Sequence, residues 1–287
     1  MSATEATPRL GYIGLGNMGA PMAQRLLEWP GGVTVFDVRA EAMAPLVEGG
    51  AGRAGSVADV AANADIISIT VLDDAQVREV VAELAAQAKP GTVIAIHSTI
   101  ADTTAAELAA ELKPRGIHVV DAPVSGGAGA AEKGKLATMV GAERAVYEQI
   151  KPAFKQWASL VIHAGEPGAG TRMKLARNML TFTGYAAAGE AMKLAEAAGL
   201  DLQALGRVVR HTDALTGGPG AIMLLDSTAP LPADHFLREA FTHTRGLGEK
   251  DLSLALGLGQ DTGVDLPLAR AALAELAAGL GVPHSTD

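Results

Sequence analysis

Residues 11–27 read GYIGLGNMGAPMAQRLL, and this stretch decides the fold of the first half of the chain. An apolar run typical of a buried strand leads into a G-x-G-x-x-G pattern, and apolar residues at helical spacing follow it. In such a turn the first glycine permits a tight bend, the second lets the backbone approach a pyrophosphate, and the third lets the helix pack on the strand. The stretch therefore predicts a dinucleotide-binding turn. The predicted cofactor-binding residues in it are Gly14, Gly16, Asn17, Met18 and Gly19.

The next apolar run, residues 33–37, reads VTVFD and ends in an acidic residue at about the distance of twenty positions that the dinucleotide fingerprint requires. A carboxylate at Asp37 can accept hydrogen bonds from the ribose hydroxyls and would repel a 2′-phosphate. Arg39 follows two residues later and keeps NADP open. We therefore predict NAD as the cofactor, with NADP as the alternative.

The composition narrows the class of protein. The 287 residues suffice for one large or two ordinary domains. The absence of cysteine excludes disulfides and cysteine metal sites, and a net charge of −9 without a basic cluster argues against nucleic acid or anionic membranes as partners.

The sequence opens with no signal-peptide pattern and holds no apolar run of about eighteen residues. We expect a cytoplasmic protein without a membrane span. The histidines form no metal-binding signature, so we expect no metal.

Residues 9–164 alternate short apolar runs with amphipathic helical stretches. The predicted strands are residues 10–13, 33–38, 66–71, 93–98, 118–121, 137–140 and 161–163. Such alternation implies right-handed crossovers and a largely parallel sheet covered by helices. The predicted fold class of this half is therefore α/β, as a Rossmann-type domain.

The pattern changes at residues 165–170, where the strand-like runs stop. Residues 171–198 form one helical pattern, long enough to cross a domain of roughly 40 Å. Shorter helical patterns follow over 202–210, 221–225, 248–258 and 268–280. We predict a dinucleotide-binding domain over residues 1–165 and an all-helical substrate and oligomerisation domain over 166–287, with the long helix between them.

Two polar residues near the start of the long helix are candidates for chemistry. Lys174 and Asn178 are four positions apart and therefore lie on one helix face. A hydroxyacid must lose its hydroxyl proton as hydride leaves the same carbon, and a neutral lysine amine can take that proton. Burial and a nearby cation would lower the pKa of such a lysine toward working pH. The spacing alone is equally consistent with an ordinary solvated lysine.

Four stretches, taken together and in this order, resemble the signature segments of the β-hydroxyacid dehydrogenase family, which includes 3-hydroxyisobutyrate dehydrogenase. They are GLGNMG at 14–19, DAPVSGG at 121–127, GAGTRMKLARN at 168–178 and KDLSLAL at 250–256. The resemblance extends from about residue 9 to residue 275 and implies a dinucleotide domain followed by an all-helical domain. It further implies oxidation of a small 3-hydroxy acid such as 3-hydroxyisobutyrate with NAD or NADP.

The resemblance also implies roles for single residues. Lys174 would be the catalytic acid and base, and Asn178 would help to hold the substrate. The substrate carboxylate would bind at Ser125, Gly126 and Gly127. The remaining cofactor contacts that the resemblance implies are Val71 and Leu72 at the adenosine half, Thr99 at the nicotinamide side, and Lys250 toward cofactor and substrate.

Two other functions stay open from the sequence. One is a reductase of another small carbonyl or an imine on the same scaffold, although imine reductases generally lack the lysine. The other is a non-catalytic dinucleotide-binding protein, which would need the glycine turn but neither Lys174 nor the segment 125–127. Family members commonly associate, so we also expect a homodimer or homotetramer.

Overall fold

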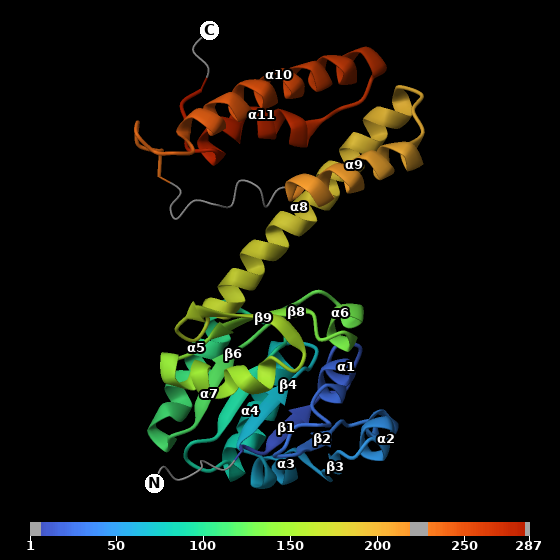
Figure 1. Cartoon of the computed structure of the whole chain (residues 1–287). Helices are drawn as coiled ribbons and strands as arrows, with labels where there is room; N and C mark the ends of the chain where they lie inside the picture. Colours follow the sequence, from blue (N-terminus) through green and yellow to red (C-terminus); the bar gives the residue numbers. More distant parts are fainter. Residues whose placement is uncertain (1–6, 219–228, 285–287) are drawn as a thin grey trace. The chain divides into compact units, whose positions relative to one another are not determined.

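The computed structural model describes residues 7–218 and 229–284 (Figure 1). The helix predicted over 221–225 lies outside the described residues. The chain divides into two compact units, Met1–Asn178 and Met179–Asp287, each of which is considered by itself. The division falls within the long helix, whose first turns are hydrogen-bonded to the first unit.

The first unit is built on one mixed sheet in the strand order β3-β2-β1-β4-β5-β6-β8-β7, with β9 paired to β8. The strands are β1 (Leu10–Ile13), β2 (Val33–Phe36), β3 (Gly52–Arg53), β4 (Ile66–Ile69), β5 (Val93–Ile96), β6 (His118–Asp121), β7 (Val124–Ser125), β8 (Leu136–Gly141) and β9 (Ala158–Gly165). The six strands from β3 to β6 are parallel, as the alternating pattern predicted. The short strands β3 and β7 were not predicted, because two residues carry no periodicity.

Helices cover both faces of this sheet, each over its own apolar core. The helices of the unit are α1 (Gly19–Gln24), α2 (Ala40–Glu48), α3 (Val57–Asn63), α4 (Asp74–Gln87), α5 (Asp102–Leu112), α6 (Ala128–Glu132) and α7 (Arg144–Phe154). One core gathers buried residues of α1, α2, α6 and α7, and the other gathers those of α3, α4 and α5. Strands β1, β4 and β5 are buried throughout, which explains their continuous apolar runs. The predicted doubly wound α/β domain is confirmed.

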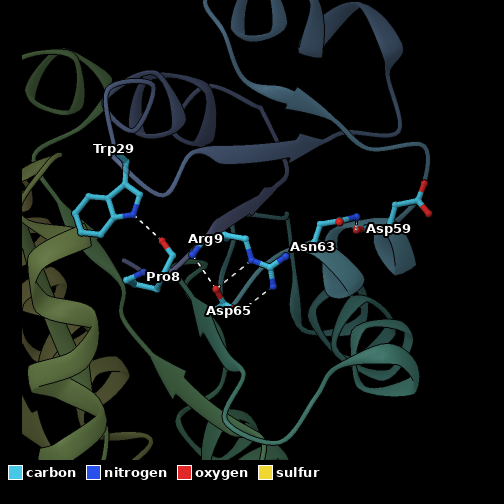
Figure 2. A network of polar contacts seen from close by, with 6 residues as sticks. All are labelled: Pro8, Arg9, Trp29, Asp59, Asn63 and Asp65. Carbon is cyan, nitrogen blue, oxygen red and sulfur yellow. Dashed lines mark hydrogen bonds and ion pairs between the residues drawn. The ribbon is translucent and has the colours of Figure 1, made fainter. Parts of the chain in front are cut away.

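An ion pair joins the amino ends of two neighbouring central strands. Figure 2 shows Arg9, just before β1, clasping Asp65, just before β4: the Arg9 backbone N–H donates to Asp65 at 2.8 Å and its guanidinium pairs with the same carboxylate at 3.0 Å. The indole N–H of Trp29 donates to the carbonyl of Pro8 at 2.8 Å. These contacts hold the register in which Leu10 faces Ile66. They lie at the amino ends of the strands, whereas the glycine turn lies at the carboxyl end of β1. They therefore stabilise the strands that carry the turn.

Within the described residues, four helices follow β9: α8 (Ala169–Ala197), α9 (Leu202–Thr216), α10 (Arg238–Thr262) and α11 (Pro267–Gly279). Helix α8 ends as predicted before Gly199, whose φ of +73° suits glycine. In the second unit the carboxylate of Glu190 on α8 accepts hydrogen bonds from the backbone N–H groups of Leu268 and Ala269, and so caps α11. The described part of this unit is helical, as predicted. Among the described helices, none is both long and apolar enough to cross a membrane.

Candidate active site

The candidate cofactor residues lie at the carboxyl ends of adjacent parallel strands. The strands β2, β1, β4 and β5 lie side by side, and they lead into Asp37, Gly14, Val71 and Thr99 respectively. The chain order reverses between β1 and β4, since β2 and β3 lie on one side of β1 and the later strands on the other. Ligands of open α/β sheets bind in the crevice outside such a reversal point. The topology therefore brings these predicted residues together at one edge.

The glycine turn has the backbone geometry that a dinucleotide requires. Gly14 has a φ of +88°, and a Cβ atom there would lie 2.1 Å from the carbonyl oxygen of Thr70. A Cβ atom on Gly19 would lie 1.9 Å from the carbonyl oxygen of Gly14. A Cβ atom on Gly16 would instead meet no atom within 4 Å. Two glycines are thus required by packing, whereas Gly16, like its exposed neighbour Asn17, leaves open space for a phosphate.

Asp37 is buried next to this turn, and its carboxylate is already hydrogen-bonded. It accepts from the backbone N–H of Leu15 at 2.7 Å and from that of Arg39 at 2.9 Å, and it pairs with the Arg39 guanidinium at 3.2 Å. Burial by itself would raise the pKa of the Asp37 carboxyl, but these hydrogen bonds and the arginine charge outweigh it, so the pKa is lowered. Asp37 is therefore ionised at neutral pH, and its bond to Leu15 helps to shape the glycine turn. The bond to Leu15 was not predicted, because it joins two separate loops.

The loops after β4 and β5 are joined by Ser98, which sequence reasoning missed. Its hydroxyl donates to the carbonyl of Val71 at 2.7 Å and accepts from the N–H of Val71 at 2.9 Å. Leu72 next to it is 82 % exposed, an unusual state for a leucine. Thr99 is also exposed. Apolar and hydroxyl groups are thus presented at the strand ends where a cofactor would lie, and a serine at the end of a buried strand was the available signal.

Lys174 contacts the predicted substrate segment directly. Its ammonium nitrogen donates to the carbonyl oxygen of Val124 at 2.6 Å and to the hydroxyl oxygen of Ser125 at 3.0 Å. Helix α8 presents the lysine, and strand β7 presents the serine. The lysine is half-buried, and burial first, then the nearby positive charge of Arg177, lowers the pKa of its ammonium group. The lowered pKa makes the neutral amine more accessible than it is in a solvated lysine, which suits the group to proton transfer.

The glycines after Ser125 have different surroundings. Gly126 and Gly127 adopt φ values of +135° and +74°. A Cβ atom on Gly126 would lie 2.8 Å from the Cβ atom of Ala130, whereas one on Gly127 would meet nothing within 4 Å. Gly127 therefore leaves space beside the serine that a small anion could enter. Asn178 is half-buried, and its side-chain oxygen accepts a hydrogen bond from Arg177 at 3.3 Å.

Two further predictions concern Lys250 and metals. Lys250 lies in α10, and its side chain is outside the described part of the structure. Within residues 7–218 and 229–284 no group of three histidine, aspartate or glutamate side chains is arranged to hold a metal ion.

Comparison with known proteins identifies the family. Residues 9–165 match the NAD-binding domain of 6-phosphogluconate dehydrogenase, and residues 168–282 match the NAD-binding domain of NADP-dependent 3-hydroxyisobutyrate dehydrogenase. The chain belongs to the β-hydroxyacid dehydrogenase family. It is accordingly an NAD(P)-dependent oxidoreductase, and the expected family and cofactor class are confirmed.

Members of this family are similar to the chain over nearly its full length. An uncharacterised oxidoreductase of Mycobacterium tuberculosis is 71% identical over 99% of this chain and 97% of its own. The crystal structure of a Mycobacterium avium 104 protein is 78% identical, with a TM-score of 0.94, and covers 96% of this chain and 100% of its own. A structure of Mycobacterium tuberculosis 3-hydroxyisobutyrate dehydrogenase with L-serine is 31% identical, with a TM-score of 0.68, and covers 94% of this chain and 93% of its own.

The β-hydroxyacid dehydrogenase fold is also shared with imine reductases. The imine reductase of Streptomyces aurantiacus matches with a TM-score of 0.73 at 21% identity, over 96% of each chain. At this identity the likeness concerns the fold alone.

Proposed function

We propose that this chain catalyses the reversible, NAD-dependent oxidation of a small 3-hydroxy acid, with Lys174 as the acid and base. The observation that carries the proposal is the contact of the Lys174 ammonium with Ser125 and Val124. A non-catalytic dinucleotide-binding protein would not need a lysine of lowered pKa directed at a loop with open space beside it.

Different residues of the first unit are proposed to bind the substrate and to transfer the proton. The substrate carboxylate is proposed to bind at Ser125, Gly126 and Gly127, where a hydroxyl and backbone groups are available. Bound NAD(P) supplies the hydride acceptor at the carbon that carries the hydroxyl group. Lys174, as the neutral amine, takes the hydroxyl proton in oxidation and, as the ammonium, returns it in reduction. Asn178, one helical turn after Lys174, is proposed to help hold the substrate.

The cofactor is proposed to bind across the strand ends, with Gly14, Gly16, Asn17, Met18 and Gly19 at the pyrophosphate. Val71 and Leu72 are assigned to the adenosine half, and Thr99 to the nicotinamide side. The role of Lys250 stays a prediction from the family resemblance. NAD is preferred over NADP in this proposal, because the Arg39 guanidinium is paired with Asp37 and the pair leaves a carboxylate at the ribose position.

The substrate class is tested by screening purified protein for NADH formation with a panel of 3-hydroxy acids. The panel contains 3-hydroxyisobutyrate, L-serine, 3-hydroxypropionate and 2-(hydroxymethyl)glutarate, with 2-hydroxy acids as controls. L-serine is included because a homologous dehydrogenase structure contains it. Turnover with a 3-hydroxy acid and none with the 2-hydroxy isomers is expected. A parallel assay offers cyclic imines with NADPH, and turnover in that assay alone would replace the proposal with the imine reductase alternative.

Self-association is proposed as well. Helix α9 carries exposed Val208, Val209 and Leu215, at 60%, 46% and 74% exposure. Apolar side chains of this kind favour packing against another helix. A molar mass of at least two chains by light scattering is expected, and a monomer at tens of micromolar would contradict it.

A further inference from the structure

The start of helix α8 has no side chain of its own to cap it. Its preceding residue is Gly168, with a φ of +94°. A Cβ atom there would lie 2.6 Å from the carbonyl oxygen of Asp102, so glycine is required by both conformation and space. The free N–H groups of the first turn therefore need an acceptor from elsewhere in the chain.

Asp121, the last residue of β6, supplies that acceptor. Its side chain is fully buried, with one carboxylate oxygen accepting from the N–H of Gly168 at 2.7 Å and the other from the N–H of Thr171 at 2.6 Å. In a capping box these two N–H groups, at the cap and three residues on, are bonded by two side chains of the helix itself. Here one carboxylate from the sheet bonds both.

The surroundings of Asp121 leave the helix start little freedom to shift. Asp121 lies opposite Gly141 in the β6–β8 pairing, and a Cβ atom on Gly141 would be 2.1 Å from the Asp121 carboxylate. A Cβ atom on Gly170, in the first turn of α8, would be 2.3 Å from the carbonyl oxygen of Met139. The backbones of the sheet and of helix α8 are therefore in contact at this point. The Asp121 carboxylate occupies the space beside Gly141.

The same two segments meet a second time at Lys174. Asp121 and Ser125 are four residues apart in one segment, and Thr171 and Lys174 are three residues apart on one face of α8. The two hydrogen bonds of Asp121 and the two of Lys174 thus join segment 121–125 to segment 168–174 at both ends. A movement of the helix start would displace the lysine from the serine.

We infer that Asp121 is a positioning residue, which sets the place of Lys174 beside Ser125 by bonding the first turn of α8. Its effect on turnover rests on the proposed function, whereas its effect on Lys174 does not. Asp121→Asn is the sharpest change because the side chain keeps its shape. Its amide group replaces one acceptor with a donor, so either Gly168 or Thr171 must lose its bond.

The first test measures Lys174 without any substrate. Trace acetylation with acetic anhydride, followed by peptide mass spectrometry, reports the reactivity of each lysine. In Asp121→Asn the acetylation rate of Lys174 should change by several-fold, while that of Lys113, which is ion-paired to Glu143 on the surface, stays constant. An unchanged Lys174 rate in a folded Asp121→Asn protein would overturn the inference, whatever the substrate proves to be.

The second test uses the substrate identified by the panel. Asp121→Asn should lower kcat by on the order of 10²-fold, as expected for a displaced catalytic group, and leave the Kd for NAD within twofold. The solvent deuterium isotope effect on kcat should increase, because proton transfer becomes slower. A lower amount of active protein with an unchanged isotope effect would show a purely structural role.

Two further variants keep these tests decisive. Ser56→Ala removes the hydroxyl that caps α3, where Ser56 accepts from the N–H of Asp59 at 3.1 Å. It controls for loss of a helix cap in the same unit and should leave Lys174 reactivity and kcat unchanged. If Asp121→Asn does not fold, Asp121→Ser retains one small acceptor, and the same change at Lys174 is expected. A normal Lys174 rate in folded Asp121→Ser would contradict the inference.

Discussion

The ammonium nitrogen of Lys174 lies 3.0 Å from the hydroxyl oxygen of Ser125, although 49 residues separate them in the chain. The same nitrogen donates to the carbonyl of Val124. Because a carbonyl oxygen can only accept, the lysine keeps at least one proton directed at the backbone in this arrangement. A substrate hydroxyl beside Ser125 would therefore meet a group that can both give and take a proton.

Replacing Lys174 should separate binding from chemistry. We expect Lys174→Ala to lower kcat by about 10²–10⁴-fold, the usual range for a general acid and base, without changing the Kd for NAD. Stopped-flow or steady-state NADH absorbance gives kcat, and fluorescence titration gives the Kd. Lys174→Arg is the matched control. Arginine keeps the positive charge but stays protonated and cannot act as a base, so this variant should be as inactive as the alanine variant. Near-normal turnover in either would refute the mechanism.

The rates of oxidation and of reduction should change with pH in opposite directions. Oxidation needs the neutral amine, so its rate should rise with pH through the pKa of Lys174, and reduction should fall over the same range. Burial and Arg177 lower this pKa below the ordinary 10.5, so both midpoints should lie below that value.

Arg177→Gln removes a nearby positive charge and should move both midpoints to higher pH. Arg172→Gln is the control on the same helix, because Arg172 is exposed and lies 3.8 Å from Asp102, and it should leave them in place. Equal midpoints in wild type and Arg177→Gln would contradict the assignment of the titrating group.

Asp37 should decide between the two cofactors. Asp37→Ser removes the carboxylate that repels a 2′-phosphate and releases Arg39 from its ion pair. We expect the ratio of kcat/KM for NADP to that for NAD to rise at least about tenfold, a change of roughly 1.4 kcal/mol in relative binding. Because Asp37 also bonds Leu15, some loss with both cofactors is expected, and the ratio is the informative quantity. If the wild-type protein already used NADP at least as efficiently, the NAD preference would be wrong.

His97 should make the first unit sensitive to acid. It is buried, with Nδ1 2.7 Å from the carbonyl of Ala122 and Nε2 2.9 Å from the hydroxyl of Ser68. Since the carbonyl can only accept, Nδ1 carries the proton and Nε2 accepts from the serine. Burial lowers the pKa of His97 from 6.5 to about 4, against the raising effect of the Ala122 bond.

The unfolded chain therefore binds a proton at His97 at higher pH than the folded one does. The stabilisation is fully present above pH 6.5 and is lost as the pH falls toward 4, by roughly 3 kcal/mol in the free energy of unfolding. Urea unfolding at several pH values measures it. Glutamine cannot be protonated, so the His97→Gln protein should be less stable at neutral pH. Its free energy of unfolding should change less with pH than that of the wild type. Parallel curves for the two proteins would show that folding does not lower the pKa of His97 and would contradict the prediction.

Local patterns accounted for much of the fold because their physical basis is local. Strands β1 and β6 lie at their predicted residues, since apolar periodicity and turn residues act within a few positions. Helix α8 begins two residues before its predicted start, because Asp121 supplies the missing cap from another element. Such a contribution leaves no mark in the sequence of the helix itself.

The sequence by itself determined the alternating α/β domain, the glycine turn and the acidic residue after the second strand, because each depends on neighbours in the chain and on side-chain size. Only the tertiary structure decided that Asp37 bonds the turn, that Ser98 joins two loops and that Asp121 bonds the helix start. It also decided that Lys174, already a candidate from the sequence, contacts Ser125. These contacts join residues 22 to 50 positions apart, and only the pairing of strands and the packing of helix α8 on the sheet bring them within a hydrogen-bond length.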